Sequence, residues 1–217
     1  MPLGDAEEAA LREGASALGV ALDAVALARL GLFLDELDRW RERVNLVSVR
    51  SRLEIVDRHV VDSLAAVPVL LAEGSGIRVA DLGSGAGFPG VPIAIAAVGL
   101  RVTLVEPRRK RANFLRAVLR RLDRPGLGVV ESRIEDLAPP RTAPFDAVTT
   151  RATFPVEELP GVAGPLVRTG GLVVAFTRDG EPVAGAADSG FESAVAYRYR
   201  LADETGAFQL TSWRRRG

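Results

Sequence analysis

The sequence has no cysteine and a single histidine among its 217 residues. Without cysteine the chain cannot form disulfide bonds, use a thiol nucleophile, or build a zinc or iron–sulfur site on sulfur. One histidine also excludes metal sites with several histidine ligands, so no metal site is expected. With 47% hydrophobic residues, the chain is nevertheless long and apolar enough to bury the core of a globular protein.

Long hydrophobic runs are missing too. The longest run, residues 91–100, is far too short to span a bilayer, and the first eight residues, MPLGDAEE, are acidic where a signal peptide is basic. We therefore expect a cytoplasmic protein without a membrane partner, and we take a monomer as its expected state.

Lysine occurs once, as Lys110, so 27 of the 28 basic residues are arginine, and 28 acidic residues balance them. A net charge of zero argues against indiscriminate binding of nucleic acid, which depends on neutralising phosphates. The charge is uneven, however. Residues 1–40 carry eight acids and three arginines, whereas residues 101–125 carry nine basic residues and two acids, which predicts a local basic surface.

The first 70 residues have the periodicity of helices. Apolar residues recur three, four and seven positions apart from Asp5 to Arg43, and three glycines in that stretch predict two helices rather than one. A third helix is predicted over residues 54–71, with an interruption near Pro68.

From residue 74 the pattern changes to short apolar runs that alternate with helical stretches. The predicted strands cover residues 78–82, 101–106, 128–131, 143–149 and 171–176, and the helices between them residues 91–98, 109–122 and 156–167, with a short turn at 134–137. This alternation predicts an α/β fold with a doubly wound, mostly parallel sheet. Residues 193–201 and 208–214 flank Gly206 and predict an antiparallel C-terminal hairpin, which makes seven strands. We expect a helical segment, residues 1–73, packed on a core domain, residues 74–217.

The strongest local motif is DLGSGAGFPG at residues 81–90, directly after the first predicted strand and at the start of a helix. Glycines there let the chain turn tightly and bring backbone N–H groups close to a ligand. Glu106 ends the next strand, 23 residues beyond Gly83, where an acid can accept hydrogen bonds from both hydroxyls of a ribose. Loop and acid together predict a nucleoside pocket that includes Gly83, Gly85 and Glu106.

Two nucleoside ligands fit this loop. Gly85, Gly87 and Gly90 match the fingerprint of dinucleotide-binding proteins, so an NAD-dependent oxidoreductase is one hypothesis. Asp81 favours S-adenosylmethionine instead, because its carboxylate can meet a ligand ammonium but repels a pyrophosphate. Helices before the sheet and a hairpin after it also favour a methyltransferase. No Gly-Lys-Ser/Thr follows the loop, which excludes a P-loop.

Two further segments follow predicted strands, at the sheet edge where ligands of parallel sheets bind. After the third strand, Ile134 can pack against an adenine while Glu135 or Asp136 accepts from its amine. The alternative is an acidic pair that stabilises a helix N-terminus by about 0.3–1 kcal/mol. After the fourth strand, Arg151 can reach the transferred group, and we favour this function over a solvated arginine.

The helix predicted over residues 109–122 has arginines on one face and no acids nearby to balance them. The stretch 108–124 can therefore follow RNA phosphates, or it can simply face solvent. His59 invites a catalytic role, but a lone histidine on a helix is more often structural, and we expect it to hydrogen-bond to Asp62.

Several motifs together resemble the glucose-inhibited division protein B family. They are NLVS at residues 45–48, RHVVDSL at 58–64, DLGSGAGFPGVP at 81–92, KRANFLR at 110–116 and RA at 151–152. The resemblance covers about residues 30–178. Members of the family are bacterial methyltransferases that methylate N7 of one guanine in 16S ribosomal RNA.

The resemblance implies a class I, Rossmann-like methyltransferase fold and S-adenosylmethionine as the methyl donor. Carried over by position, the cofactor contacts fall on Gly83, Phe88, Ile134, Glu135 and Arg151, and the ribose-binding acid on Glu106. Arg151 is also the candidate catalytic residue, in a positioning role. Candidate RNA contacts are Arg108, Arg109, Lys110, Arg111 and Arg178. Asn45, Arg58, His59, Asp62 and Ser63 match a family motif for which the sequence gives no chemical role.

The chain departs from the family in two places. Members usually carry Leu-Lys-Gly after the fifth strand, whereas this chain reads FTRDG at residues 176–180. Arg178 is the candidate replacement for the lysine, although arginine and lysine are not interchangeable at a tight site. The basic residue that usually opens the last strand is also missing around residues 207–208. Both departures bear on RNA contacts or catalytic efficiency more than on cofactor binding.

Guanine N7 has a lone pair and no proton, so its attack on a sulfonium methyl needs no general base. Catalysis can then rest on positioning, which contributes up to about 7–11 kcal/mol. The first hypothesis is thus a 16S rRNA guanine-N7 methyltransferase, acting on bare RNA or on the 30S particle. The alternatives are an NAD-dependent oxidoreductase and a catalytically weak nucleotide-binding module associated with the ribosome.

Overall fold

The computed structural model describes residues 3–41, 43–44, 46–47, 51–137, 144–151, 153–178, 190–201 and 207–217. Asn45, Ala152, Gly206 and residues 179–180, which figured in the sequence predictions, lie outside these ranges, as does Ala143, the predicted start of the fourth strand. Within the described residues, every helix is too short or too polar to cross a bilayer.

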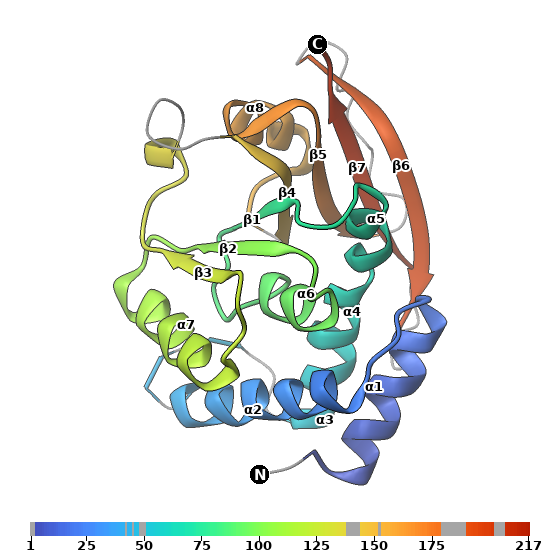
Figure 1. Cartoon of the computed structure of the whole chain (residues 1–217), viewed down its shortest axis with the longest axis vertical. Helices are drawn as coiled ribbons and strands as arrows, with labels where there is room; N and C mark the ends of the chain where they lie inside the picture. The colour runs from blue at the N-terminus through green and yellow to red at the C-terminus, as the bar shows by residue number, and fades with distance from the viewer. Residues whose placement is uncertain are drawn as a thin grey trace.

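Seven strands form one sheet in the order β3-β2-β1-β4-β5-β7-β6 (Figure 1). They are β1 (Arg78–Leu82), β2 (Arg101–Val105), β3 (Leu127–Val130), β4 (Phe145–Arg151), β5 (Val167–Arg178), β6 (Phe191–Arg200) and β7 (Ala207–Arg215). The first five are parallel, and β7 runs antiparallel to both β5 and β6. The predicted class I methyltransferase architecture, including the C-terminal hairpin, is confirmed.

The fifth strand is longer than the apolar run that predicted it. It continues to Arg178 because β7 pairs with it along its length, up to the pair Arg178 and Phe208. This extension brings Phe176, Arg178 and Phe208 together beyond the end of β4.

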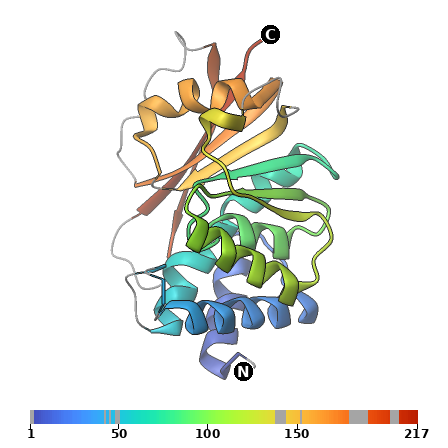
Figure 2. The same cartoon turned by 90° about the vertical axis from the view of Figure 1, so that its left-hand side faces the viewer.

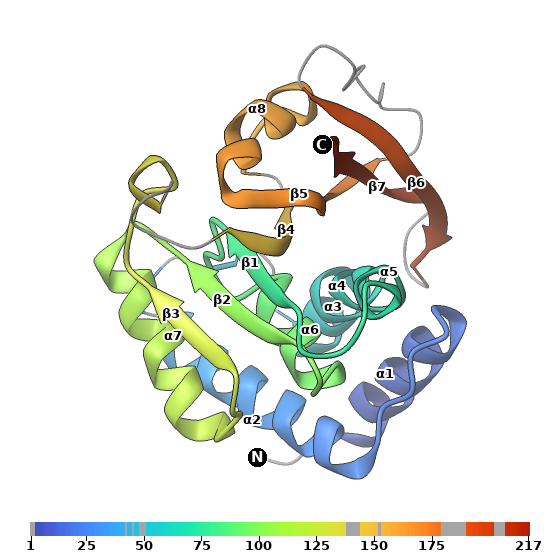
Figure 3. The ribbon, with the colours of Figure 1, turned by 45° about the horizontal axis from the view of Figure 1, so that its top comes forward.

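Helices cover both faces of the sheet (Figures 2 and 3). They are α1 (Asp5–Ala17), α2 (Ala24–Arg41), α3 (Arg52–Ile55), α4 (Asp62–Leu64), α5 (Ala66–Ala72), α6 (Gly90–Ala96), α7 (Arg109–Leu122) and α8 (Leu159–Ala163). One apolar cluster joins the first face to α6, α7 and the N-terminal helices, from Leu11 through Phe33 to Val79. A second cluster joins the other face to α8 and to Trp213, which is fully buried.

Helix α7 covers the residues predicted for it. Ala112, Leu115, Val118 and Leu122 recur at helical spacing and are buried, which fixes the face that packs on the core. The helix ends at Asp123, whose left-handed backbone (φ 40°) cannot continue it.

The third predicted helix is present and is interrupted near Pro68, as predicted. A break at Ala65 separates α4 from α5, and Pro68 lies in the first turn of α5, where its missing N–H costs no hydrogen bond. A second irregularity, the π-helical turn Val56–Val61, separates α3 from α4 and was not predicted. The π-helical turn contains His59 and directly precedes Asp62.

Candidate active site

The glycine loop follows β1 as predicted, and its backbone is held by two carboxylates. The N–H of Gly85 donates to Oε2 of Glu106 (2.9 Å), and the N–H of Gly90 donates to Oδ2 of Asp81 (3.1 Å). Oε1 of Glu106 also accepts from the N–H of Arg108 (2.8 Å). Glu106 is buried, with only 3% of its surface exposed. Its two hydrogen bonds link the glycine loop to the segment after β2.

Gly83 must be glycine for two independent reasons. Its φ of 72° lies in the left-handed region, and an added Cβ would lie 2.6 Å from Cγ2 of Thr153. The Thr153 side chain therefore packs directly against the backbone of Gly83, which brings the segment after β4 close to the end of β1.

A cleft of about 930 Å³ opens at this edge of the sheet. Among the predicted cofactor residues, Gly83, Glu106, Ile134, Glu135 and Arg151 all line it. Ile134 is buried and apolar, whereas Glu135 and Asp136 are exposed. An apolar wall with acidic groups beside it and a carboxylate at its base suits the adenine and ribose of a nucleoside.

The other predicted cofactor residues lie behind this cleft. Asp81 is completely buried beneath the loop, and its Oδ1 has no hydrogen-bond partner among the described residues. Burial raises the pKa of Asp81 to about 7, because the ionised carboxylate is poorly solvated. Gly85 faces Glu106, and Phe88 packs against the rings of Phe33 and His59, both 5.2 Å away. Their contribution to a cofactor site is structural in this arrangement.

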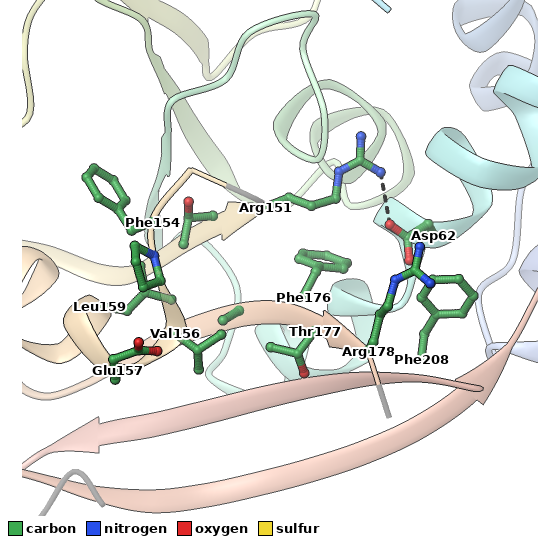
Figure 4. A pocket seen from close by; sticks show the side chains of 13 residues that line it. Asp62, Arg151, Phe154, Val156, Glu157, Leu159, Phe176, Thr177, Arg178 and Phe208 are labelled. Carbon is green, nitrogen blue, oxygen red and sulfur yellow. Dashed lines mark hydrogen bonds and ion pairs between the residues drawn. The ribbon is translucent and has the colours of Figure 1, made fainter. Parts of the chain in front are cut away.

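A second cavity, of about 490 Å³, adjoins the cleft (Figure 4). Arg151 and Phe154 line both cavities and form the partition between them. The second cavity lies between the end of β4, the segment 154–159 and the ends of β5 and β7. Two reactants bound in adjoining cavities would meet at Arg151 and Phe154.

Arg151 is held in place by groups from distant parts of the chain. Its Nη1 lies 2.9 Å from Oδ2 of Asp62 on α4, and its guanidinium lies over the ring of Phe88, 5.3 Å from the centroid (Figure 4). The hydroxyl of Tyr199 on β6 donates a short hydrogen bond to Oδ1 of Asp62. Burial and the neighbouring carboxylate raise the pKa of Tyr199 above its ordinary value, so it remains a donor. Asp62 thus joins the N-terminal helices, β4 and the hairpin.

His59 does not hydrogen-bond to Asp62, so that prediction was wrong. Both oxygens of Asp62 are used by Arg151 and Tyr199, and Nδ1 of His59 is buried without a partner among the described residues. Burial, together with repulsion from Arg151, lowers the pKa of His59 to about 4. His59 is therefore neutral near pH 7 and serves as a packing partner of Phe88. Ser63 belongs to the same motif, and its hydroxyl donates to the backbone carbonyl of His59.

The predicted RNA contacts divide into three groups. Arg109 and Lys110 are exposed at the start of α7, whereas Arg108 and Arg111 line the cofactor cleft. Arg178 lines the second cavity instead. Arg151 lies between the cleft that Arg108 and Arg111 line and the cavity that Arg178 lines.

The basic face of α7 is less free than its sequence indicates. Arg116 pairs with Glu131 (2.8 Å), and Arg121 pairs with Glu36 on α2 (3.2 Å). Arg124 is buried and donates to the carbonyls of Ala94, Ala97 and Leu100. Acids from other elements therefore balance two arginines of α7, Arg116 and Arg121, whereas Arg109 and Lys110 at its start and Arg120 near its end are exposed.

Comparison with known proteins identifies the family of the chain. Residues 26–182 match the family model described as rRNA small subunit methyltransferase G, the GidB family. The chain belongs to the rRNA small subunit methyltransferase G family. Relatives of that name are 42% identical in Sorangium cellulosum (75% of this chain, 68% of the relative) and 44% identical in Xanthomonas axonopodis pv. citri (77% and 76%).

Solved structures share the fold at low identity. The crystal structure of MtNAS in complex with MTA and tNA superposes with a TM-score of 0.62 at 18% identity, over 98% of this chain and 86% of that one. HI0767 of Haemophilus influenzae, described as a methylase, superposes with a TM-score of 0.52 at 18% identity, over 71% and 88%. These likenesses support the fold alone.

Two contributors to the site escaped the sequence predictions. Phe154 follows the fourth strand with no motif around it, and Tyr199 lies in an ordinary alternating strand. Asp62 belongs to the family motif at residues 58–64. The sequence does not reveal its role, because its partners Arg151 and Tyr199 are far away in the chain.

Proposed function

We propose that this protein transfers a methyl group from S-adenosylmethionine to N7 of a guanine in 16S ribosomal RNA. The observation that carries the proposal is the pair of adjoining cavities that meet at Arg151 and Phe154, in a chain of this methyltransferase family. One cavity has the loop and acid of a nucleoside site. The other is open to a second reactant.

The residues present fit the cofactor. The backbone of Gly83, the apolar wall at Ile134 and the carboxylate of Glu106 line the cleft and suit its adenosine part. S-adenosylmethionine supplies an electrophilic methyl group on a sulfonium, which leaves as a neutral thioether once the methyl is transferred. Asp81 supports the same loop from beneath, where its Oδ2 accepts from the N–H of Gly90.

The chemistry of guanine N7 suits the side chains at the partition. The N7 lone pair attacks without losing a proton, so no general base is required. The ionisable groups among the described residues that line the two cavities are carboxylates and arginines. Arg151 acts by position: Asp62 and Phe88 fix its guanidinium, which orients the two reactants in line.

The basic start of α7 supports an RNA partner. Arg109, Lys110 and Arg111 occupy the first turn, which contains no acid, although cations there interact unfavourably with the helix dipole. Phosphates of the RNA would offset this repulsion. We therefore propose Arg108, Arg109, Lys110 and Arg111 as phosphate contacts beside the cofactor cleft, in a monomer that acts in the cytoplasm on the rRNA of the 30S particle.

Family membership does not favour the alternatives, an NAD-dependent oxidoreductase or a weak nucleotide-binding module. Calorimetry with S-adenosylmethionine, S-adenosylhomocysteine and NAD separates the ligands. The proposal expects binding of the two sulfur ligands and none of NAD. Tight binding of NAD without either sulfur ligand would reject a methyltransferase.

A further inference from the structure

We propose that the second cavity is the site of the target base: it binds one guanine, taken out of its stack in the RNA, with the ring over Phe176. This inference rests on the proposed function and extends it to the residues that select the base. Enzymes that modify a base bring it out of the stack into a pocket that stacks on its faces and reads its edge. The cavity between β4, β5 and β7 has the parts for each task.

The size and place of the cavity suit a single base next to the methyl donor. Its volume of about 490 Å³ lies within the range of small-ligand sites, and it opens to solvent. Among the residues that the structure describes, Arg151 and Phe154 line both this cavity and the cofactor cleft. A base in this cavity therefore presents one edge to the cleft, as an attack by N7 requires.

Three aromatic side chains line the cavity without being fully buried. Phe154, Phe176 and Phe208 are each half-buried, whereas the other phenylalanines of the described residues are buried. Phe176 and Phe208 pack against the core on one face of the sheet, and Phe154 packs against the core on the other. Phe208 is supported from behind by Tyr199, with stacked rings 5.8 Å apart. Since every base has a π-face, such rings are the common platform for an unstacked nucleotide.

Two charged groups lie at opposite ends of the cavity, on either side of Phe176. Figure 4 places Glu157 at one end, beside Val156 and Leu159, and Arg178 with Phe208 at the other, with Phe176 between them. Both Glu157 and Arg178 are exposed at the rim. The cavity therefore offers an acceptor at one end and a cation at the other.

Glu157 is the group that distinguishes guanine from adenine. Guanine has hydrogens on N1 and on its 2-amino group, and one carboxylate can accept both. Adenine has no hydrogen on N1, so the same carboxylate would face a lone pair. With the N1 edge at Glu157, the opposite edge of guanine, which carries N7, turns away toward the partition at Arg151.

Arg178 serves the backbone of the same nucleotide. Its strand position, opposite Phe208, holds a guanidinium at the mouth of the cavity. A phosphate next to an extruded base would lie at that mouth, and arginine can bind it with two hydrogen bonds. This assignment gives a role to the residue that stands near the position of the family's lysine.

The first test removes the aromatic platform. We expect Phe176→Leu, which keeps an apolar side chain, to raise the KM for 30S particles about tenfold and to leave the Kd for S-adenosylmethionine unchanged. Phe145→Leu is the matched control: Phe145 is buried at the opposite end of β4, so its loss lowers Tm without changing KM. An unchanged KM in Phe176→Leu, or an equal rise in the control, overturns the stacking role.

The second test addresses the choice of base by direct binding. In saturation-transfer NMR with S-adenosylhomocysteine bound, wild-type protein should bind guanosine monophosphate at least tenfold more tightly than adenosine monophosphate. Glu157→Gln should abolish this preference, whereas Glu158→Gln, its exposed neighbour outside the cavity, should keep it. Equal binding of both nucleotides by the wild type, binding of neither, or a preference that survives Glu157→Gln rejects the assignment.

The third test measures the phosphate contact. Arg178→Gln should reduce the slope of log KM against log salt concentration by about one, the amount expected for one lost phosphate contact. Arg168→Gln changes an arginine at the other end of β5 and should leave the slope as it is. An unchanged slope in Arg178→Gln removes this residue from the site.

These results separate the inference from the proposed function. Methylation of 30S particles by the wild type tests the function. If methylation occurs and the three cavity variants behave like the wild type, the base lies elsewhere and only the inference fails.

Discussion

Replacing Asp62 by asparagine tests how the partition between the two cavities is held. Asp62 carries one ion pair, with Arg151, and accepts one hydrogen bond, from Tyr199. The side chains of Arg151 and Asp62 are only 18% and 8% exposed, so solvent screens the pair weakly. Asparagine has nearly the same shape but carries no charge, which leaves the guanidinium without its counter-charge.

The cost follows from these contacts. Leaving one partner of a buried ion pair uncompensated costs about 3–5 kcal/mol. Asparagine still offers an oxygen to Arg151 or Tyr199, and the guanidinium keeps its contact with Phe88, worth about 0.5–2 kcal/mol. We therefore expect a loss of about 2 kcal/mol in the free energy of unfolding, which lowers Tm by about 4–8 °C in a chain of this size.

Activity should fall further than stability explains. A reactive group displaced by about 1 Å can cost about a hundredfold in rate, and Arg151 loses its anchor while the fold remains. We expect kcat to fall about a hundredfold at a temperature well below Tm. The variant Tyr199→Phe is the control, since it removes one hydrogen bond and keeps the ion pair, and should cost about 1–2 kcal/mol with a smaller loss of kcat.

Urea unfolding and steady-state methylation of 30S particles measure both quantities. The reasoning would be refuted by an Asp62→Asn protein that unfolds within about 0.5 kcal/mol of the wild type and keeps its kcat. A loss of stability without a loss of kcat would show that Asp62 supports the fold only.

Three other perturbations test the surroundings of the site. Gly83→Ala should abolish cofactor binding because the added Cβ meets Thr153. The control is Gly76→Ala: Gly76 has a similar φ of 77° but no atom near an added Cβ, so this variant should cost only about 1–2 kcal/mol of stability. Equal effects of the two variants on cofactor binding would contradict this account. Glu106→Ala should weaken S-adenosylmethionine binding at least tenfold in calorimetry, and unchanged affinity would show that the ribose lies elsewhere. The pKa of His59 is about 4 in the folded chain, so the unfolded chain binds more protons between pH 6.5 and 4, and stability is lost as the pH falls through that window. His59→Gln should remove about 2–3 kcal/mol of this loss between pH 7 and pH 4 in urea titrations, and an unaltered pH profile would show that the ring is not buried in solution.

Local patterns were sufficient to predict most of the fold. The boundaries of β1 and α7 were predicted from a short apolar run and from the helical spacing of apolar residues. Both patterns lie within the element that they predict. The interruption near Pro68 was predictable from the proline itself, whereas the π-helical turn Val56–Val61 has no signal in the sequence. The length of β5 depends on its partner β7, which is more than 30 residues away.

The cofactor side of the site was predictable because one loop and the ends of adjacent parallel strands form it. The other side was not, because it depends on contacts between distant elements. Asp62 and Arg151 are 89 residues apart, and Tyr199 comes from an edge hairpin. Arg124 illustrates the same limit: its charge suggested an RNA surface, and only the fold shows that backbone carbonyls surround it.

The central claim is that this protein methylates a guanine of small-subunit rRNA at N7. The most direct measurement incubates the protein and labelled S-adenosylmethionine with 30S particles, and separately with bare 16S rRNA, from a strain that lacks the gene, and then maps the label. The account predicts about one methyl group per particle, on N7 of a single guanine. Cofactor binding without transfer to either substrate, or label on another atom or base, would contradict it.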